Sequence, residues 1–338
     1  MGIISDALKK LTEEPTLKIS MMGPRGVGKT SVLTSIFRES SESIAGSTLY
    51  LRAENATSGL LTSTRLKLSD AFETKNAANL PASSTEEQFL FEIGRKGRAP
   101  SVKLIVHDFP GEYLTSSDAN KNEAVSTFIR ESNIILVAID TPYLMEENGK
   151  YNEQKNEVGL VSDYFIKYAD SFKNKLVLFI PLKCELYFHN DTIENVTRAV
   201  EHAYSNLLPF FRDNNIASVV CPIQTLGDID YTKMIDNPIP MAGSTKIAQY
   251  EFRGANPEYS PRYCSQPLYY LLTYAVNYYE WSSKHPSGAF FERMFSSIRS
   301  LFKNDTDFFL EAKKLNRYII NDDTQFKVLV NNTILKIN

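Results

Sequence analysis

Short apolar runs and helical patterns alternate along most of the chain. Four runs of strand length are almost wholly apolar: "LKISMMG" (17–23), "NIILVAID" (133–140), "KLVLFIPL" (175–182) and "IASVVCPI" (216–223). Such runs are typical of strands that are buried on both faces of a parallel sheet. After the first run, Val32, Leu33 and Ile36 recur at helical spacing. This order predicts an α/β fold, a three-layer α/β/α sandwich with a mostly parallel sheet.

One antiparallel hairpin strand is expected within this sheet. In "QFLFEIGRKGRAPSVKLIVHDF" (88–109), two stretches of alternating apolar residues flank a turn that contains Gly94, Gly97 and Pro100. Alternation on both sides of a glycine-rich turn predicts a β-hairpin.

Two long segments lack a clear pattern. Residues 39–87 are rich in Ser, Thr, Ala and Asn. A stretch of this length is expected to carry some helix of its own or to become ordered on binding. Residues 228–261 are rich in Pro and Gly and are predicted to form a loop.

The C-terminal part begins with a Tyr-rich helix, "PLYYLLTYAVNYYEW" (267–281), whose aromatic residues we interpret as core and packing surface. Two further helices are predicted around 290–302 and 307–318. The stretch "FKVLVNNTILKI" predicts a hairpin that turns at Asn331-Asn332. We therefore expect one domain over 15–285 and a helical and hairpin extension over 286–338 that packs on it.

Composition excludes several classes of protein. The 338 residues are 43% hydrophobic and 23% charged, as in globular proteins. The net charge of -3 lacks the basic excess of nucleic-acid-binding proteins, so no nucleic-acid partner is expected. No apolar run approaches the roughly 20 residues of a membrane helix, so no membrane insertion is expected. Three widely separated cysteines in no metal-ligand spacing favour reduced thiols and a cytoplasmic location.

The first apolar run leads directly into a glycine-rich motif. "GPRGVGKT" (23–30) fits the pattern G-x-x-x-x-G-K-[ST] and stands between a predicted strand and a predicted helix. Its glycines let backbone N–H groups point into one concavity at a helix N-terminus, which suits phosphate. Lys29 would supply charge to the β- and γ-phosphates, and the Thr30 hydroxyl would ligate Mg²⁺. The residues predicted to contact the nucleotide here are Gly23, Arg25, Gly26, Val27, Gly28, Lys29, Thr30 and Ser31.

A carboxylate follows on the far side of the predicted hairpin. In "KLIVHDFPGE", Asp108 closes an apolar strand, where it can hold Mg²⁺ through a water. Gly111 lies three residues later, where a backbone N–H can sense a γ-phosphate. An ordinary strand that ends in an Asp-initiated turn is the alternative.

A third motif, "FIPLKCELY" (179–187), covers the end of the predicted strand 175–182 and the residues after it. The stem of Lys183 can lie over a purine, and the carboxylate of Glu185 can accept from the two N–H donors of guanine that adenine lacks. A solvated loop after a strand is the competing interpretation. After the following strand, "PIQTLG" (222–227) offers backbone groups at Thr225 and Leu226 that can close over the base.

With these motifs in order, the sequence resembles the Ras-like (TRAFAC) class of P-loop GTPases. "GPRGVGKT" is similar to the first guanine-nucleotide motif of that class, "DFPG" to the third, "LKCE" to the fourth and "QTLG" to the fifth. The resemblance implies a P-loop NTPase fold that binds GTP or GDP with Mg²⁺. It also implies a switch threonine, a Mg²⁺ ligand, just before the hairpin. Thr85 stands there, with Ser83 and Ser84 as alternatives, and 39–87 would be a large insertion in the first switch.

A narrower similarity rests on "HDFPGE", "PIQTLG" and "PRYCSQPLYYLL". These strings resemble the bacterial double-GTPase proteins of prokaryotic conflict systems, in which a pair of diverged GTPases is encoded together. That resemblance covers about residues 15–330 and implies a protein partner, either a second GTPase or an effector.

Three departures from the GTPase pattern bear on chemistry. Leu182 and Glu185 flank Lys183 where the fourth motif normally reads N-K-x-D or T-K-x-D, and the extra methylene of Glu185 re-aims the contact with guanine. Glu112 follows "DFPG" where Ras-like proteins often carry a water-orienting glutamine, so slow turnover is expected. Arg25 lies inside the phosphate loop, either as a cation for catalysis in cis or pointing to solvent.

The sequence thus predicts a Mg²⁺-dependent guanine-nucleotide switch with slow GTP hydrolysis that acts with a protein partner. Its candidate catalytic residues are Lys29, Thr85, Glu112 and Arg25. Two alternatives remain open. One is a nucleotide-binding assembly module with little or no hydrolysis, and the other is a P-loop protein that uses ATP.

Overall fold

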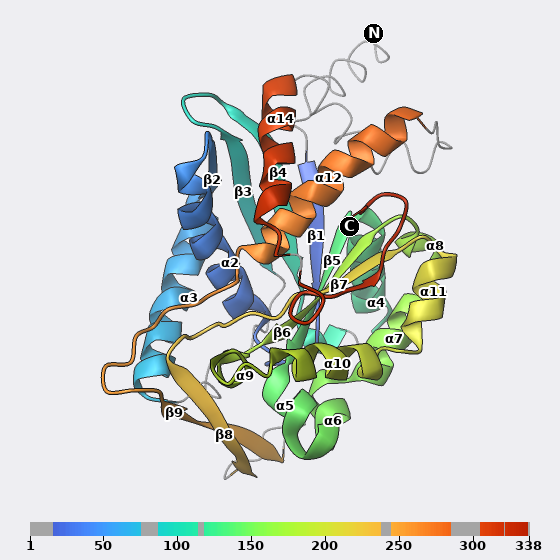
Figure 1. Ribbon diagram of the computed structural model, residues 1–338. Helices are drawn as coiled ribbons and strands as arrows, with labels where there is room; N and C mark the ends of the chain where they lie inside the picture. Colours follow the sequence, from blue (N-terminus) through green and yellow to red (C-terminus); the bar gives the residue numbers. More distant parts are fainter. Residues whose placement is uncertain are drawn as a thin grey trace.

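A computed structural model describes residues 16–75, 87–113, 118–237, 245–284, 305–320 and 322–336 (Figure 1). Its centre is an eight-stranded sheet in the order β10-β7-β6-β5-β1-β4-β3-β2. Five neighbouring strands are parallel: β1 (Thr16–Met22), β4 (Pro100–Asp108), β5 (Ile134–Asp140), β6 (Leu176–Leu182) and β7 (Ala217–Val220). Their carboxyl ends therefore meet along one edge of the sheet.

Antiparallel strands complete the sheet on both sides. β3 (Glu87–Arg95) pairs antiparallel with β4, as the hairpin pattern predicts, and β2 (Leu49–Ala53) pairs antiparallel with β3. At the opposite edge, β10 (Val328–Val330) pairs antiparallel with β7.

Helices cover both faces of the sheet (Figure 1). The apolar side chains of β5 divide between the two faces, since Leu136 packs in one core and Val137 in the other. The helices that share the core of Leu136 include α2 (Lys29–Ser43), α12 (Gln266–Lys284) and α14 (Thr306–Lys314). Those that share the other core include α4 (Ala119–Glu131), α7 (Val158–Lys167), α10 (Ile193–Ala203) and α11 (Leu207–Asp213). The predicted three-layer sandwich with a mostly parallel sheet is confirmed.

Shorter elements connect these layers. Single turns of 3₁₀ helix follow α2, β4 and α14. They are η1 (Ile44–Gly46), η3 (Gly111–Tyr113) and η5 (Leu315–Tyr318). The connection from β5 to α7 holds α5 (Thr141–Met145), η4 (Glu146–Gly149) and α6 (Asn152–Asn156). α8 (Ala169–Phe172) precedes β6, and α9 (Glu185–His189) follows it.

The segment 39–87 is more regular than its composition indicates. It contains the end of α2, the edge strand β2 and the long helix α3 (Asn55–Glu73). The prediction of some helix is confirmed, but β2 was missed. Its five residues bury only Leu49 and Leu51 on the core side, because an edge strand has one covered face.

The predicted loop at 228–261 is wrong. It contains an antiparallel pair, β8 (Ile229–Asp236) and β9 (Lys246–Phe252), which forms a separate two-stranded sheet at the lower end of the molecule in Figure 1. Its apolar side packs on α3, where the rings of Phe72 and Phe252 lie 5.1 Å apart. This tertiary contact stabilises a hairpin whose own sequence has weak strand signals.

The predicted hairpin at Asn331-Asn332 has only its first strand, β10. The residues after it form a turn, in which the Asn332 side chain accepts from the amides of Ile334 (3.0 Å) and Leu335 (2.7 Å). Ile334 and Leu335 are buried in the core rather than paired with β10. The open edge of β7 offers β10 a partner within the main sheet, which a local hairpin pattern does not reveal.

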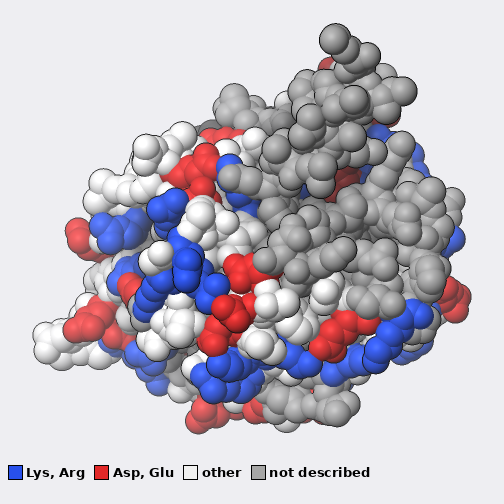
Figure 2. Space-filling model, turned by 90° about the horizontal axis from the view of Figure 1, so that it is seen from above, with Lys and Arg blue, Asp and Glu red and all other residues white. Residues whose placement is uncertain are grey.

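The C-terminal helix α14 lies beside the β3–β4 turn. Arg95 at that turn forms an ion pair with Asp307 of α14 over 2.9 Å. Seen from above (Figure 2), Lys and Arg side chains lie next to Asp and Glu side chains over the described part of this face. The helix predicted around 290–302 lies outside the described residues. None of the described helices is long and apolar enough to cross a membrane.

Candidate functional site

Glycines shape the loop that joins β1 to α2. Gly26 (φ +71°) and Gly28 (φ +109°) adopt left-handed backbone conformations, which favour glycine. Gly28 is the N-cap residue of α2, so the helix starts at Lys29. A Cβ on Gly23 would lie 3.1 Å from the carbonyl oxygen of Ala138, so the loop crosses directly over the end of β5. Successive conformations of this kind turn backbone N–H groups toward one concavity, an anion-binding geometry.

Two side chains predicted to hold phosphate and metal lie at this loop. The Lys29 ammonium donates to the carbonyl oxygens of Gly23 (3.0 Å) and Pro24 (3.4 Å). The Thr30 hydroxyl donates to Asp108 Oδ2 over 2.6 Å. Asp108 ends β4, and Thr30 follows β1, so parallel pairing of these two strands brings hydroxyl and carboxylate together.

Asp108 is a buried carboxylate, and the two oxygens of its side chain differ in their hydrogen bonding. Burial raises its pKa, whereas the Lys29 charge and the Thr30 hydrogen bond lower it. Its Oδ1 is buried and makes no hydrogen bond within the described part of the chain. Mg²⁺ prefers oxygen ligands and is typically held by one or two protein groups together with substrate phosphates. Asp108 and Thr30 therefore fit Mg²⁺ and are the residues that would hold it.

Gly111 touches the phosphate loop with its backbone. A Cβ at this position would lie 2.2 Å from the backbone nitrogen of Arg25 and 2.4 Å from the carbonyl carbon of Pro24. These atoms cannot move aside like the end of a flexible side chain, so only glycine fits. The "DFPG" segment thus meets the glycine-rich loop, as a sensor of the terminal phosphate would.

Lys183 is held by a residue that the sequence reasoning missed. Its ammonium forms an ion pair with Asp140 Oδ2 over 2.6 Å. Asp140 ends β5, Lys183 follows the paired strand β6, and Asp140 is wholly buried. Leu182, which departs from the fourth GTPase motif, is also buried, and its Cδ1 would lie 3.3 Å from a Cβ on Gly28. An Asp at the end of a buried strand was the available signal for Asp140.

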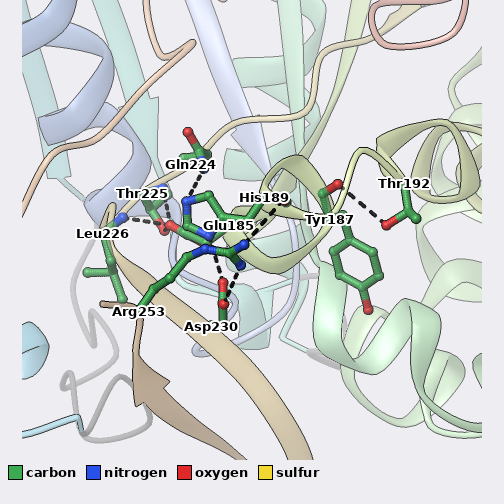
Figure 3. A network of polar contacts seen from close by, with 9 residues as sticks. All are labelled: Glu185, Tyr187, His189, Thr192, Gln224, Thr225, Leu226, Asp230 and Arg253. Carbon is green, nitrogen blue, oxygen red and sulfur yellow. Dashed lines mark hydrogen bonds and ion pairs between the residues drawn. The ribbon is translucent and has the colours of Figure 1, made fainter. Parts of the chain in front are cut away.

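The residues predicted to face the base contact one another (Figure 3). Glu185 Oε1 accepts from the backbone N–H groups of Thr225 (2.6 Å) and Leu226 (2.7 Å). Glu185 is buried at the start of α9; burial raises its pKa, and hydrogen bonds from the backbone around Leu226 lower it. The carboxylate therefore ties the fourth motif to the fifth through the same amides that were predicted to close over the base.

A polar network extends from this contact to the β8–β9 hairpin (Figure 3). His189 Nδ1 lies 2.7 Å from Asp230 Oδ1, and Arg253 donates to Asp230 Oδ2 over 2.8 Å. The other ring nitrogen of His189 lies 3.4 Å from Gln224 Nε2. The network joins α9 and Gln224 to β8 and to Arg253, the residue that follows β9.

The structure describes the three other candidate catalytic residues to different extents. The Arg25 side chain is exposed, and its carbonyl oxygen accepts from the Lys155 ammonium over 3.4 Å. The structure describes the backbone of Glu112, within η3, but not its side chain. Thr85, with its alternatives Ser83 and Ser84, lies outside the described residues.

Comparison with known proteins identifies no family. No protein-family model and no curated protein matches the chain. Solved structures that resemble it include the S. cerevisiae Ski7 GTPase-like domain bound to GTP and the same domain bound to GDP and inorganic phosphate. Each shows 14% identity and a TM-score of 0.34, over 66% of this chain and 45% of the other. The chain thus matches less than half the length of those structures, and likeness at this level supports no conclusion about function.

Proposed function

We propose that this chain is a Mg²⁺-dependent guanine-nucleotide switch that hydrolyses GTP slowly and acts with a protein partner. The observation that carries the proposal is the meeting of two motifs, "GPRGVGKT" and "DFPG", at one loop. Lys29 lies at a glycine-rich turn before α2, Thr30 bonds Asp108, and Gly111 touches the loop backbone. The Asp108 segment alone could be an ordinary strand that ends in a turn, but its contact with the glycine-rich loop supports a single nucleotide site.

The chemistry follows from where the groups lie. Loop amides and the Lys29 ammonium would offset the charge that spreads over the γ-phosphoryl group during transfer. Thr30 and Asp108 would hold Mg²⁺, which would supply further positive charge beside the phosphates. The loop would keep these donors in place before the reaction, because Gly111 and the end of β5 confine its backbone.

Slow turnover and switching rest on the segment after Asp108. A carboxylate at Glu112 would be repelled by the γ-phosphate, so it would orient water less well than glutamine does. Because Gly111 is packed against the phosphate loop, loss of the γ-phosphate would shift the backbone that follows Gly111. The partner that reads this change would be a second GTPase or an effector, as in the bacterial conflict systems that the sequence resembles.

A binding measurement tests the phosphate site. We expect the purified chain to bind GDP and GTP, and Lys29→Ala to weaken binding at least about 100-fold, since a buried charge-assisted contact is lost. Lys313→Ala, an exposed substitution on α14, is the control and should bind as the original chain does. Equal affinity in Lys29→Ala and the original chain would rule out the proposed site.

Turnover and base choice need separate measurements. We expect slow multiple-turnover release of phosphate from GTP that requires Mg²⁺; tight binding with no release, with or without a partner, would favour the assembly module. Glu185 is engaged by the amides of Thr225 and Leu226, which gives the ATP alternative its support. Competition between GTP and ATP for the one site distinguishes guanine recognition from ATP use. Preference for ATP would contradict guanine recognition.

A further inference from the structure

A second lysine approaches the phosphate loop from outside the recognised motifs. The Lys155 ammonium lies 3.4 Å from the carbonyl oxygen of Arg25 and 3.2 Å from the position that a Cβ on Gly26 would occupy. It also lies 5.7 Å from the centre of the Tyr143 ring. Among the described residues, no carboxylate oxygen lies within ion-pair distance of this ammonium.

The helix that carries Lys155 is fixed at this place. Its next residue, Asn156, is buried, accepts from the backbone N–H of Asp140 over 2.8 Å, and donates to the Asp140 carbonyl oxygen over 3.1 Å. On its outer side, Gln154 donates to Thr245 of the β8–β9 hairpin over 3.1 Å. α6 is therefore hydrogen-bonded both to the end of β5 and to the hairpin. These contacts hold Lys155 beside the loop.

Among the described residues, several positively charged side chains gather around the loop. The ammonium groups of Lys29 and Lys183 are each close enough to repel that of Lys155. Asp140 is paired with Lys183, and the Asp108 carboxylate lies on the metal side with Thr30. Burial, together with Lys183 and Lys29, lowers the pKa of Lys155, while Asp140 and Glu157 oppose that shift. A polyanion bound at the loop would relieve this repulsion.

We propose that Lys155 binds the phosphate chain of the nucleotide, as a second phosphate lysine supplied in cis by α6. The proposal rests on the nucleotide site proposed above and adds a residue that belongs to none of its sequence motifs. The other role open to Lys155 is mechanical, as a hydrogen-bond donor that props the loop through the Arg25 carbonyl oxygen. The two roles differ in their need for positive charge.

Three substitutions separate charge from propping. Lys155→Met removes both the charge and the donor, Lys155→Gln removes the charge but keeps an N–H donor, and Lys155→Arg keeps both. Lys150→Met is the matched control, because Lys150 lies in the same connection, is exposed, and pairs with Glu147. The probes are GDP and GTP with Mg²⁺, measured by calorimetry at low and high salt, alongside thermal unfolding of each nucleotide-free variant.

We expect Lys155→Met and Lys155→Gln to lose affinity for both nucleotides alike, by about 10- to 100-fold, as for a charge-assisted hydrogen bond. Lys155→Arg should retain most of the affinity, and Lys150→Met all of it. The dependence of affinity on salt should be weaker in the Met and Gln variants, because one interacting charge is gone. Unfolding temperatures without nucleotide should not fall.

Two outcomes would overturn the proposal. One is a Lys155→Gln variant that binds like the original chain, because propping would then suffice. The other is a loss of affinity in Lys155→Met that matches a loss of stability without nucleotide and is independent of salt. If the original chain binds neither nucleotide, the nucleotide site itself fails. If it binds both and Lys29→Ala does not, only the role of Lys155 is in question.

Discussion

Gly111 shows how much of the site depends on the absence of a single side chain. Its Cα lies so near the backbone of Pro24 and Arg25 that even a methyl group would overlap them. Asp108, three residues earlier, is placed by strand pairing, but the approach of Gly111 depends on sterics alone. Gly59 on the exposed side of α3 has nothing within reach of a Cβ, so the two glycines make a matched pair.

Gly111→Ala should therefore damage both stability and binding. The overlap must push the loop and η3 apart, so we expect about 1–3 kcal/mol of destabilisation, as for overpacking elsewhere, and a large loss of nucleotide affinity. Denaturant unfolding and nucleotide titration are the measurements. Gly59→Ala should instead be neutral or stabilising by up to about 1 kcal/mol, because alanine favours a helix. Similar behaviour of the two variants would contradict the close approach at Gly111.

At the scale of elements, apolar and polar contacts attach the β8–β9 hairpin to the base side of the site. Its apolar face meets Phe72 of α3, and Asp230 joins it to His189 and Arg253. A two-stranded sheet on its own is marginal in water, so these contacts determine whether the hairpin stays ordered. The same hairpin also supports α6 and thereby the position of Lys155.

Asp230→Ala should loosen this attachment. The side chain is only 19% exposed and serves two partners, so we expect a loss of about 1–3 kcal/mol and faster amide hydrogen exchange in β8, β9 and α9. Asp236→Ala in the same strand is the control. Asp236 is 89% exposed in its pair with Lys246, and exposed pairs contribute little. Equal exchange rates in the two variants would show that the polar network does not hold the hairpin.

At the scale of the whole molecule, one buried lysine makes stability depend on pH. Lys175 is wholly buried at the start of the β6 region, and its ammonium donates to the carbonyl oxygens of Ile129 (2.5 Å) and Arg130 (3.1 Å) at the end of α4. Burial lowers the pKa of Lys175 to about 7, well below its ordinary value of 10.5. Between these values the unfolded chain binds the proton and the folded chain does not.

Stability should accordingly rise with pH through this window. From pH 8 to 9 we expect Lys175 to contribute a slope of about 1.4 kcal/mol per pH unit, and no slope below pH 6, where both states are protonated. Urea unfolding of the original chain and of Lys175→Met at several pH values gives two profiles of the free energy of unfolding. The difference between the two profiles is the contribution of Lys175. Parallel pH profiles for the two proteins would refute a lowered pKa for Lys175. Measurements above pH 9 are avoided, because buried tyrosines begin to contribute there.

The sequence by itself determined the parallel strands, the hairpin and the phosphate loop, because each is encoded locally. Continuous apolar runs identify buried strands, and the glycines of 23–28 supply the backbone conformations that the loop needs. The contact of Thr30 with Asp108 was also foreseeable, since parallel strands end at the same edge of a sheet.

Only the tertiary structure decided which distant groups meet. Lys155 is one charge among many in the sequence, and it reaches the loop because Asn156 anchors α6 to β5. Glu185 bonds the amides at Thr225 and Leu226, β10 joins β7, and β8–β9 forms against α3 for the same reason. Each of these contacts depends on a surface or an unpaired strand edge that another part of the chain supplies. Periodicity along the sequence does not indicate which distant part that is.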